Sequence, residues 1–100
     1  MQLVIANIHS KDGFESEMSD VLTKLAQASR HDDGCRSYRV LSDLETSTHF
    51  MTVEEWDTPQ QVAEHLKTAH VAAALSALPD LAAGNPVITM HEVASSTNLG

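Results

Sequence analysis

Residues 53–75 read VEEWDTPQQVAEHLKTAHVAAAL, and they contain the strand-to-helix junction from which the order of the elements follows. Thr58 is a residue type preferred at helix N-caps, and Pro59 suits the first helical position because its φ is preset. Gln61 lies three residues after the cap, as in a capping box. The junction therefore predicts a strand that ends near Trp56 and a helix that begins at Pro59.

The segment after this junction is expected to be helical in two parts. The first helix should extend from Pro59 to about Leu66, and Thr68 can cap a further short helix. That helix would run to about Leu78 and end at or near Pro79, because a proline ring interrupts helical hydrogen bonding.

The rest of the chain is also periodic. Residues 2–9 form a nearly continuous apolar run, which suits a strand covered on both faces. Residues 14–28 place apolar side chains at helical spacing, which predicts an amphipathic helix that stops near Gly34. Strict alternation in the next segment would put Cys35 and Tyr38 on opposite faces of a strand. Alternating patterns predict three more strands, at residues 35–41, 49–56 and 87–93.

The order β-α-β-β-α-β is that of the α+β ferredoxin-like fold, in which helices cover one face of an antiparallel four-stranded sheet. We expect a single domain over residues 1–94 and a polar C-terminal tail over residues 95–100. The first strand is apolar on both sides, as Leu3 and Val4 illustrate, so the face without helices would expose a large apolar patch. A homodimer that packs sheet on sheet would cover this patch.

The composition limits the possible partners. The chain has 100 residues, with 6 Lys and Arg against 14 Asp and Glu, and its formal charge is −8 with neutral histidines. Nucleic acids and anionic membranes attract basic surfaces, so neither is an expected partner. The N-terminus reads as a strand and not as a signal peptide, and the single cysteine, Cys35, fits a reducing compartment. We therefore expect a cytoplasmic protein.

Three short motifs follow one another along the chain: Asp33-Gly34-Cys35 with Tyr38, Glu54-Glu55-Trp56, and His65-Leu66-Lys67-Thr68-Ala69-His70. In this order and spacing they resemble the motifs of the antibiotic biosynthesis monooxygenase family, and the resemblance spans residues 2–94. That family consists of small dimeric α/β-barrel proteins and includes cofactor-free quinol monooxygenases. Two positions depart from its pattern: Asp33 stands where proline is usual, and Val71 stands where an aromatic residue is usual.

The resemblance implies both an architecture and an activity. It implies a dimeric α/β barrel, and an enzyme that oxidises a small phenolic or quinol substrate with O₂ and without flavin, metal or haem. A deprotonated phenol is electron-rich enough to reduce O₂, so the protein would supply a base, a dry pocket and orientation. The family is functionally mixed, so two alternatives stay open: an O₂-independent isomerase of a small metabolite, and a non-catalytic dimeric ligand-binding module.

Two histidines are the candidate catalytic residues. Imidazole is the most natural base near neutral pH. His65 ranks before His70 because it lies on the helix that should cover the sheet. A histidine on such a face can equally be a hydrogen-bonded structural residue. The pocket is expected between the sheet and residues 59–78.

Five further residues are candidates for substrate binding, and most have a structural alternative. Asn7 interrupts an apolar strand, and its amide needs a partner, which a ligand oxygen or a neighbouring side chain could supply. Trp56 can line the pocket or pack in the core. Tyr38 can donate to a bound carbonyl or fill the edge of the core. Phe50 shares the strand face of Trp56, and Leu75 lies on the helical segment over the sheet.

Two other side chains have ionisable groups that could take part in chemistry. Glu54 shares a strand face with Phe50 and Trp56, so it could be a buried acid of raised pKa, but an ion pair with Arg36 or Arg39 is favoured. Cys35 has no adjacent base motif, so we expect it to be packed and not nucleophilic.

Neither a metal nor haem is expected. His65 and His70 are five residues apart, which is off one helical face, although His9 and His91 could meet if their strands pair. In haem-degrading relatives, the resemblance puts the iron-binding histidine at the position of Leu75.

Overall fold

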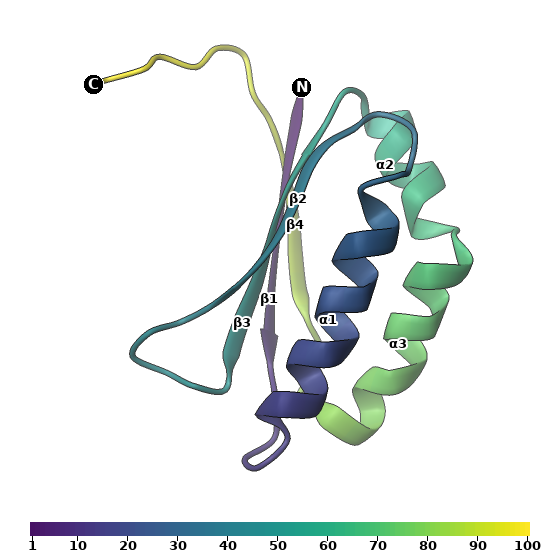
Figure 1. Ribbon diagram of the computed structural model, residues 1–100. Helices are drawn as coiled ribbons and strands as arrows, with labels where there is room; N and C mark the ends of the chain where they lie inside the picture. Colours follow the sequence, from purple (N-terminus) through teal and green to yellow (C-terminus); the bar gives the residue numbers. More distant parts are fainter.

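The computed structural model describes all of residues 1–100, and its elements follow the predicted order (Figure 1). The helical segment after the third strand is divided into two helices, as the two threonine caps predicted. The elements are β1 Gln2–His9, α1 Glu15–Ser29, β2 Cys35–Ser42, β3 His49–Trp56, α2 Pro59–Leu66, α3 Ala69–Leu81 and β4 Val87–Glu92.

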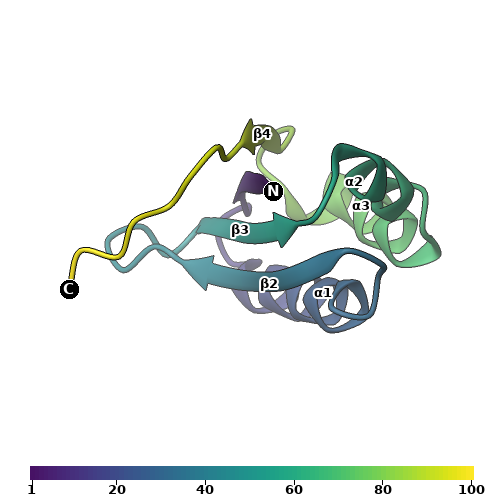
Figure 2. The ribbon, with the colours of Figure 1, turned by 90° about the horizontal axis from the view of Figure 1, so that it is seen from above.

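The four strands form one antiparallel sheet in the order β2-β3-β1-β4, with β3 and β1 at its centre. All three helices lie on one face of this sheet (Figures 1 and 2). This is the ferredoxin-like α+β fold, which confirms the predicted fold class. None of the helices combines the length and the apolar character that a membrane-crossing helix needs.

Alternation along β1 decides which of its side chains meet the helices. Val4, Ala6 and Ile8 are buried on the helix-covered face, while Leu3 and Ile5 point to the opposite face. Burial of such side chains, at roughly 1.5–3 kcal/mol for each large one, holds the helices on the sheet. Two adjoining clusters form this core: Val4, Ala26, Tyr38, Trp56 and Val62, and Ala6, Ile8, Met18, Leu22 and Phe50.

Two threonines fix where α2 and α3 begin. Thr58 accepts a hydrogen bond of 3.2 Å from the backbone N–H of Gln61, which confirms it as the N-cap of α2. Thr68 accepts a hydrogen bond of 3.4 Å from the N–H of Val71 and donates one of 2.7 Å to the carbonyl of His65. Thr68 therefore ends α2 and begins α3, and the chain changes direction between the two helices.

The end of α3 differs from the prediction. The helix does not end at Pro79 but continues to Leu81. A proline in the last turn removes a single backbone donor, and the N–H of Ala82 still bonds the carbonyl of Leu78 at 2.7 Å. Lys11 Nζ also donates to the carbonyl of Pro79 at 3.2 Å, so this end of the helix is held from outside.

The start of β2 differs as well, because the strand is not strictly alternating. Its register with β3 shifts between Cys35 and Ser37, so Arg36 is an inserted, bulged residue. Cys35 consequently packs against the core cluster that contains Tyr38, where strict alternation would have placed the two side chains on opposite faces.

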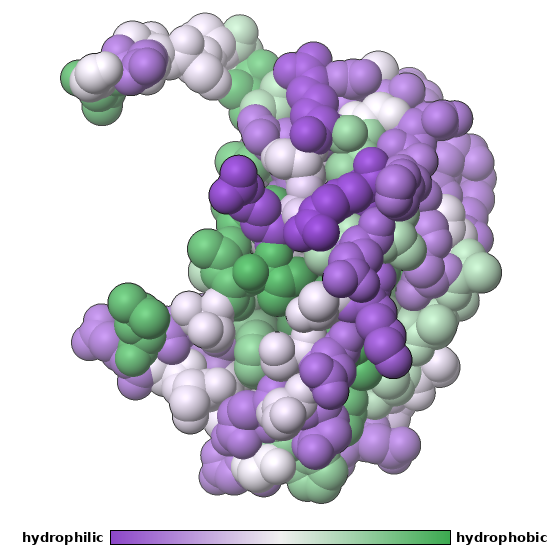
Figure 3. All heavy atoms as spheres, viewed as in Figure 1, coloured by the Kyte–Doolittle hydropathy of each residue, from purple (hydrophilic) through white to green (hydrophobic).

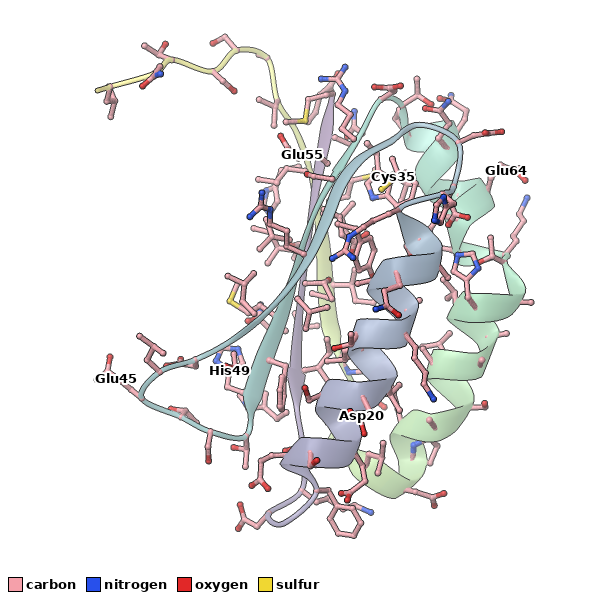
Figure 4. The ribbon with its side chains drawn as sticks, in the orientation of Figure 1. Asp20, Cys35, Glu45, His49, Glu55 and Glu64 are labelled. Carbon is pink, nitrogen blue, oxygen red and sulfur yellow. The ribbon has the colours of Figure 1, made fainter.

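The face of the sheet opposite the helices, called the open face below, is uncovered. Figure 3 shows a hydrophobic patch in the hollow of this face, between the C-terminal segment and the β2–β3 connection. His49 and Glu55 lie on this side of the sheet in Figure 4. Beyond β4, residues 93–100 have no regular secondary structure and extend away from the sheet. The apolar side chains of the open face are Leu3, Ile5, Leu41, Met51, Val53 and Val87.

Candidate functional site

A cavity of about 370 Å³ lies between the helix-covered face of the sheet and the helices α2 and α3. Pockets for small molecules have volumes of about 300–1,000 Å³. Most of the wall is apolar. Four wall residues are about half exposed, which marks the side where the cavity opens: Leu66, Leu75, Ile88 and Met90. The polar side chains of the wall are Tyr38, Thr52, Glu54 and His65.

His65 lies in the last turn of α2, and only 4% of its surface is exposed. Val62, almost one helical turn earlier, is buried on the same face of the helix, so the inward face of α2 brings the histidine to the cavity wall. The centre of its ring lies 4.6 Å from that of Trp56 and 5.7 Å from that of Tyr38. These two aromatic side chains restrict the orientation of the imidazole.

A single carboxylate oxygen contacts two imidazoles. Asp32 Oδ2 lies 2.7 Å from His65 Nδ1 and 2.8 Å from His70 Nε2. Burial by itself would raise the pKa of Asp32, but the hydrogen bonds and charges of the two histidines outweigh it and lower this pKa below its usual value. Asp32 is therefore ionised at neutral pH. An ionised carboxylate only accepts hydrogen bonds, so both ring nitrogens must donate.

The contact with Asp32 decides where His65 carries its proton. When the neutral imidazole is protonated at Nδ1, a lone pair is free at Nε2. His65 Nε2 makes no hydrogen bond within the protein, and the ring lines the cavity. His65 thus offers a proton acceptor to a molecule in the cavity, and Asp32 stabilises the imidazolium that forms when the proton is taken up.

Glu54 is a second ionisable group in the cavity wall, and it is only 4% exposed. Its carboxylate accepts hydrogen bonds of 2.8 Å from Thr52 Oγ1 and 3.0 Å from Trp56 Nε1. Burial raises the pKa of Glu54, and these hydrogen bonds together with the charge of His65 oppose that rise only in part. Glu54 can therefore hold a proton at a higher pH than an exposed glutamate.

The expected ion pair of Glu54 with an arginine does not form. Arg36 pairs with Asp57 at the protein surface. Arg39 lies opposite Val53 and so projects from the open face of the sheet. Strand alternation keeps the guanidinium group of Arg39 away from the helix-covered face, and the bulge and Asp57 hold that of Arg36 at the surface. Glu54 satisfies its oxygens with donors from its own strand.

Tyr38 and Cys35 complete the chemistry near this end of the cavity. Burial, followed by the negative charge of Glu54, raises the pKa of Tyr38, so its hydroxyl remains protonated at neutral pH. Burial, together with the charges of Glu54 and Asp32, also raises the pKa of the Cys35 thiol. Tyr38 therefore keeps its hydroxyl proton in the cavity wall, within reach of Glu54 and Thr52, whereas Cys35 is not a thiolate nucleophile.

The seven predicted site residues occupy different places. His65, Tyr38 and Leu75 line the cavity. Trp56 and Phe50 are buried in the core, and Trp56 reaches the site through its contacts with His65 and Glu54. The last two residues, His70 and Asn7, do not line the cavity.

His70 is connected to the site through Asp32, whereas Asn7 lies on the open face of the sheet. Asn7 Oδ1 accepts a hydrogen bond of 2.7 Å from His49 Nε2, so a neighbouring side chain satisfies the amide oxygen, which is one of the two predicted alternatives. His49 also stacks on His9, with ring centres 4.5 Å apart. His9 and His91 do not meet, because β1 pairs with β4 in a register that puts His91 opposite Leu3.

The residues that could hold a metal ion are Asp32, His65 and His70, whose ligand atoms lie within 4.8 Å of one another. The spacing of five residues suggested that the two histidines face apart on one helix. They instead belong to α2 and α3, and the change of direction at Thr68 brings both to the same carboxylate.

Two residues of this site were missed or misjudged in the sequence. No motif in the sequence indicates Asp32, and its only signal is that an acid directly precedes the turn before β2. Glu54 was assigned to an arginine, although Thr52 and Trp56, two residues away on the same strand face, are both suitable donors. The pattern Thr-x-Glu-x-Trp in a buried strand was therefore the available signal.

Comparison with known proteins agrees with this architecture. In solved structures, a candidate antibiotic biosynthesis monooxygenase from Deinococcus radiodurans is 29% identical, covers 100% of this chain and 99% of its own, and superposes with a TM-score of 0.94. A second candidate from Nitrosomonas europaea, 18% identical over 95% of this chain and 100% of its own, gives a TM-score of 0.90 and shows the shared fold.

No curated protein matches the chain significantly. The model of one protein family, described as antibiotic biosynthesis monooxygenase, matches residues 1–77. This match covers more than half of the chain and contains the Asp32, Glu54, His65 and His70 positions of the site. The chain therefore belongs to the antibiotic biosynthesis monooxygenase family.

Proposed function

We propose that this protein is a cofactor-independent monooxygenase that oxidises a small phenolic or quinol substrate with O₂. One observation carries the proposal: an apolar cavity of about 370 Å³ contains a histidine whose Nδ1 is held by an ionised aspartate and whose Nε2 is free. Such an arrangement suits removal of a proton from an acidic hydroxyl in a dry site. Membership of the family supports the same class of reaction.

In this mechanism His65 Nε2 takes the hydroxyl proton of the substrate, and Asp32 stabilises the resulting imidazolium. The phenolate transfers one electron to O₂, and the two radicals combine at a ring carbon to form a peroxide. The O–O bond then breaks. One oxygen atom stays on the ring, which becomes a quinone, and the other leaves as water. The quinol supplies all the electrons, so no separate reductant is consumed.

Two further groups support these steps. Protonated Glu54 can give its proton to the oxygen that leaves as water, because burial raises its pKa. The Tyr38 hydroxyl can donate a hydrogen bond to a substrate oxygen at the same end of the cavity. Leu75, with the other apolar wall residues, would orient a flat ring and exclude water.

An O₂-independent isomerase is the second candidate, and the pairing of His65 with Glu54 favours it. A base and a buried acid in one cavity can move a proton from one carbon of a small metabolite to another. This reaction needs neither O₂ nor a phenol. A non-catalytic ligand-binding module would use the same cavity without any proton transfer.

Oxygen uptake distinguishes these functions. Purified protein should consume O₂ with at least one member of a panel of naphthalene and anthracene quinols. His65→Gln should reduce the rate by about 10²–10⁴-fold, the range expected for loss of a general base. His49→Gln, a histidine of the open face, is the matched control and should keep the wild-type rate.

If no quinol in the panel supports uptake above the spontaneous rate, the monooxygenase proposal fails. Exchange of substrate hydrogen with deuterated water, tested with small α-hydroxy ketones and lost in His65→Gln, would then favour the isomerase. Binding without either reaction would favour the ligand-binding module.

We also propose that the protein acts as a homodimer through the open face, in the cytoplasm. The apolar side chains of β1, β2, β3 and β4 on this face form a patch that would be exposed to solvent in a monomer. The free thiol of Cys35 supports a reducing compartment. Packing two sheets face to face would give the barrel architecture, with one cavity in each chain.

A further inference from the structure

We propose that Asp32, His65 and His70 bind a divalent transition-metal ion, and that the ion changes which nitrogen of His65 carries the proton. The three residues come from three separate elements. Asp32 precedes β2, His65 lies in the last turn of α2 and His70 lies in the first turn of α3. The fold therefore brings the ligands together before any ion arrives, and the site lies behind the His65 ring and not inside the cavity.

The three side chains must shift by less than an ångström to hold one ion. Asp32 Oδ2 lies 2.7 Å and 2.8 Å from the two ring nitrogens, with a proton between each pair of atoms. In an octahedral complex with metal–ligand distances near 2.1 Å, neighbouring ligand atoms are about 3.0 Å apart. Each nitrogen would thus move away from the oxygen by a few tenths of an ångström. The two nitrogens, which lie within 4.8 Å of each other, would have to be at most about 4.2 Å apart on opposite sides of the ion, which takes the place of both protons.

The ligand set selects the class of ion. Two imidazoles and one carboxylate suit Zn²⁺, Co²⁺, Ni²⁺ and Fe²⁺, whereas Mg²⁺ and Ca²⁺ prefer oxygen ligands alone. Asp32 is about one-sixth exposed and His70 one-quarter exposed, so an ion can approach from solvent while His65 stays buried. The remaining coordination positions would be filled by water. The formal charge of −8 on the chain also favours the approach of a cation.

Binding would reverse the proton arrangement of His65. Without an ion, Asp32 holds the proton on Nδ1 and leaves a lone pair on Nε2. With an ion on Nδ1, a neutral imidazole must carry its proton on Nε2. The acceptor that faces the cavity is then lost. Metal binding itself does not depend on the function of the protein, but the expected inhibition rests on the proposed role of His65 as a base.

Calorimetric titration of the tag-free protein with ZnCl₂ and, separately, CoCl₂ tests the site. We expect one ion per chain, and at least a tenfold loss of affinity in Asp32→Asn and in His70→Gln. His49→Gln is the matched control, because it removes a histidine from the other imidazole cluster, next to Asn7 and His9, and should leave the affinity unchanged. Circular dichroism of each variant verifies that it is folded.

Nitrogen-15 NMR of the histidine rings supplies the second readout. Zn²⁺ should move the proton signal of His65 from Nδ1 to Nε2 and shift His70 Nε2, with no change at His49. Absence of binding, or binding that His49→Gln abolishes and Asp32→Asn does not, would overturn the proposal. If the ring signals change as expected but quinol oxidation is unaffected by Zn²⁺, the metal site stands and the role of His65 as base is wrong.

Discussion

The indole Nε1 of Trp56 donates a hydrogen bond of 3.0 Å to Oε1 of Glu54, two residues earlier on the same face of β3. Thr52, two residues earlier again, donates to the other carboxylate oxygen at 2.8 Å. The strand thus holds a buried carboxylate between two of its own donors, and no lysine or arginine neutralises it. The hydrogen bonds satisfy the oxygens, but the charge remains unfavourable in this environment.

Replacement of Glu54 by glutamine should change how stability depends on pH. Burial raises the pKa of Glu54 in the folded chain, so the unfolded chain releases this proton at lower pH. Wild-type stability should therefore fall as the pH rises from the unfolded-state pKa towards the folded-state pKa. Glu54→Gln lacks this loss, so its free energy of unfolding minus that of wild type should be larger at pH 8 than at about pH 5. Urea denaturation at both pH values measures the difference.

Glu92→Gln is the control for this comparison. Glu92 lies at the exposed end of β4, so the substitution removes one negative charge without touching a buried site. The buried-acid interpretation would be wrong if Glu54→Gln and wild type differed by the same free energy at pH 5 and pH 8.

Asp32→Asn should impair turnover more than binding. The asparagine amide is neutral, so even if its oxygen accepts from both imidazoles, as Asp32 Oδ2 does, it cannot stabilise a positive charge on them. The imidazolium that forms when His65 takes up the substrate proton would lose its counter-charge, and kcat should fall by about 10²–10⁴-fold while KM changes little. Oxygen uptake at varied quinol concentrations separates the two constants. Asp32→Glu should recover part of kcat, because it restores an acceptor that is always ionised at neutral pH. An unchanged kcat in Asp32→Asn would contradict the role of Asp32.

Much of the fold could be read from local sequence because its signals are local. The caps at Thr58 and Thr68 and the apolar run of β1 each specify an element within a few residues. The bulge at Arg36 could not be read in this way, because the register depends on how β3 presents its hydrogen-bonding groups to β2.

The site was harder to predict because it is made by contacts across the chain. His65 could be found from its position on α2, but its partner Asp32 is 33 residues earlier, and nothing near either residue indicates the other. Alternation along β1 puts Asn7 on the same side of the strand as Leu3 and Ile5. Whether that side faces the cavity depends on which face of the sheet the helices cover. Tertiary packing decides which face the helices cover, and the residue pattern of a single strand does not indicate it.

Gly34→Ala should destabilise the loop that carries Asp32. Gly34 has φ +79°, a conformation that side chains disfavour, and a Cβ atom there would run into the side chain of Gln61. We expect a loss of about 1–3 kcal/mol in urea denaturation. Gly13→Ala is a matched control, because Gly13 has φ +87° but nothing within 4 Å of an added Cβ, so it reports the backbone cost alone.

The double variant Gly34→Ala with Gln61→Ala separates the two causes. It should recover the part of the loss that arises from the collision and leave a cost similar to that of Gly13→Ala. Equal losses in Gly34→Ala and Gly13→Ala would show instead that Gln61 moves aside without cost.

Val53→Lys should prevent the proposed dimer. Val53 lies opposite Ile5 at the centre of the open face, so a dimer through this face would bury the introduced ammonium group without a partner. In light scattering at micromolar concentration, the wild type should show twice the chain mass of 10.8 kDa and the variant should show the chain mass itself. Thr23→Lys adds the same charge on the exposed side of α1 and should remain dimeric. A wild type that scatters as a single chain, or a Val53→Lys variant that keeps the doubled mass, would exclude the open face as the dimer interface.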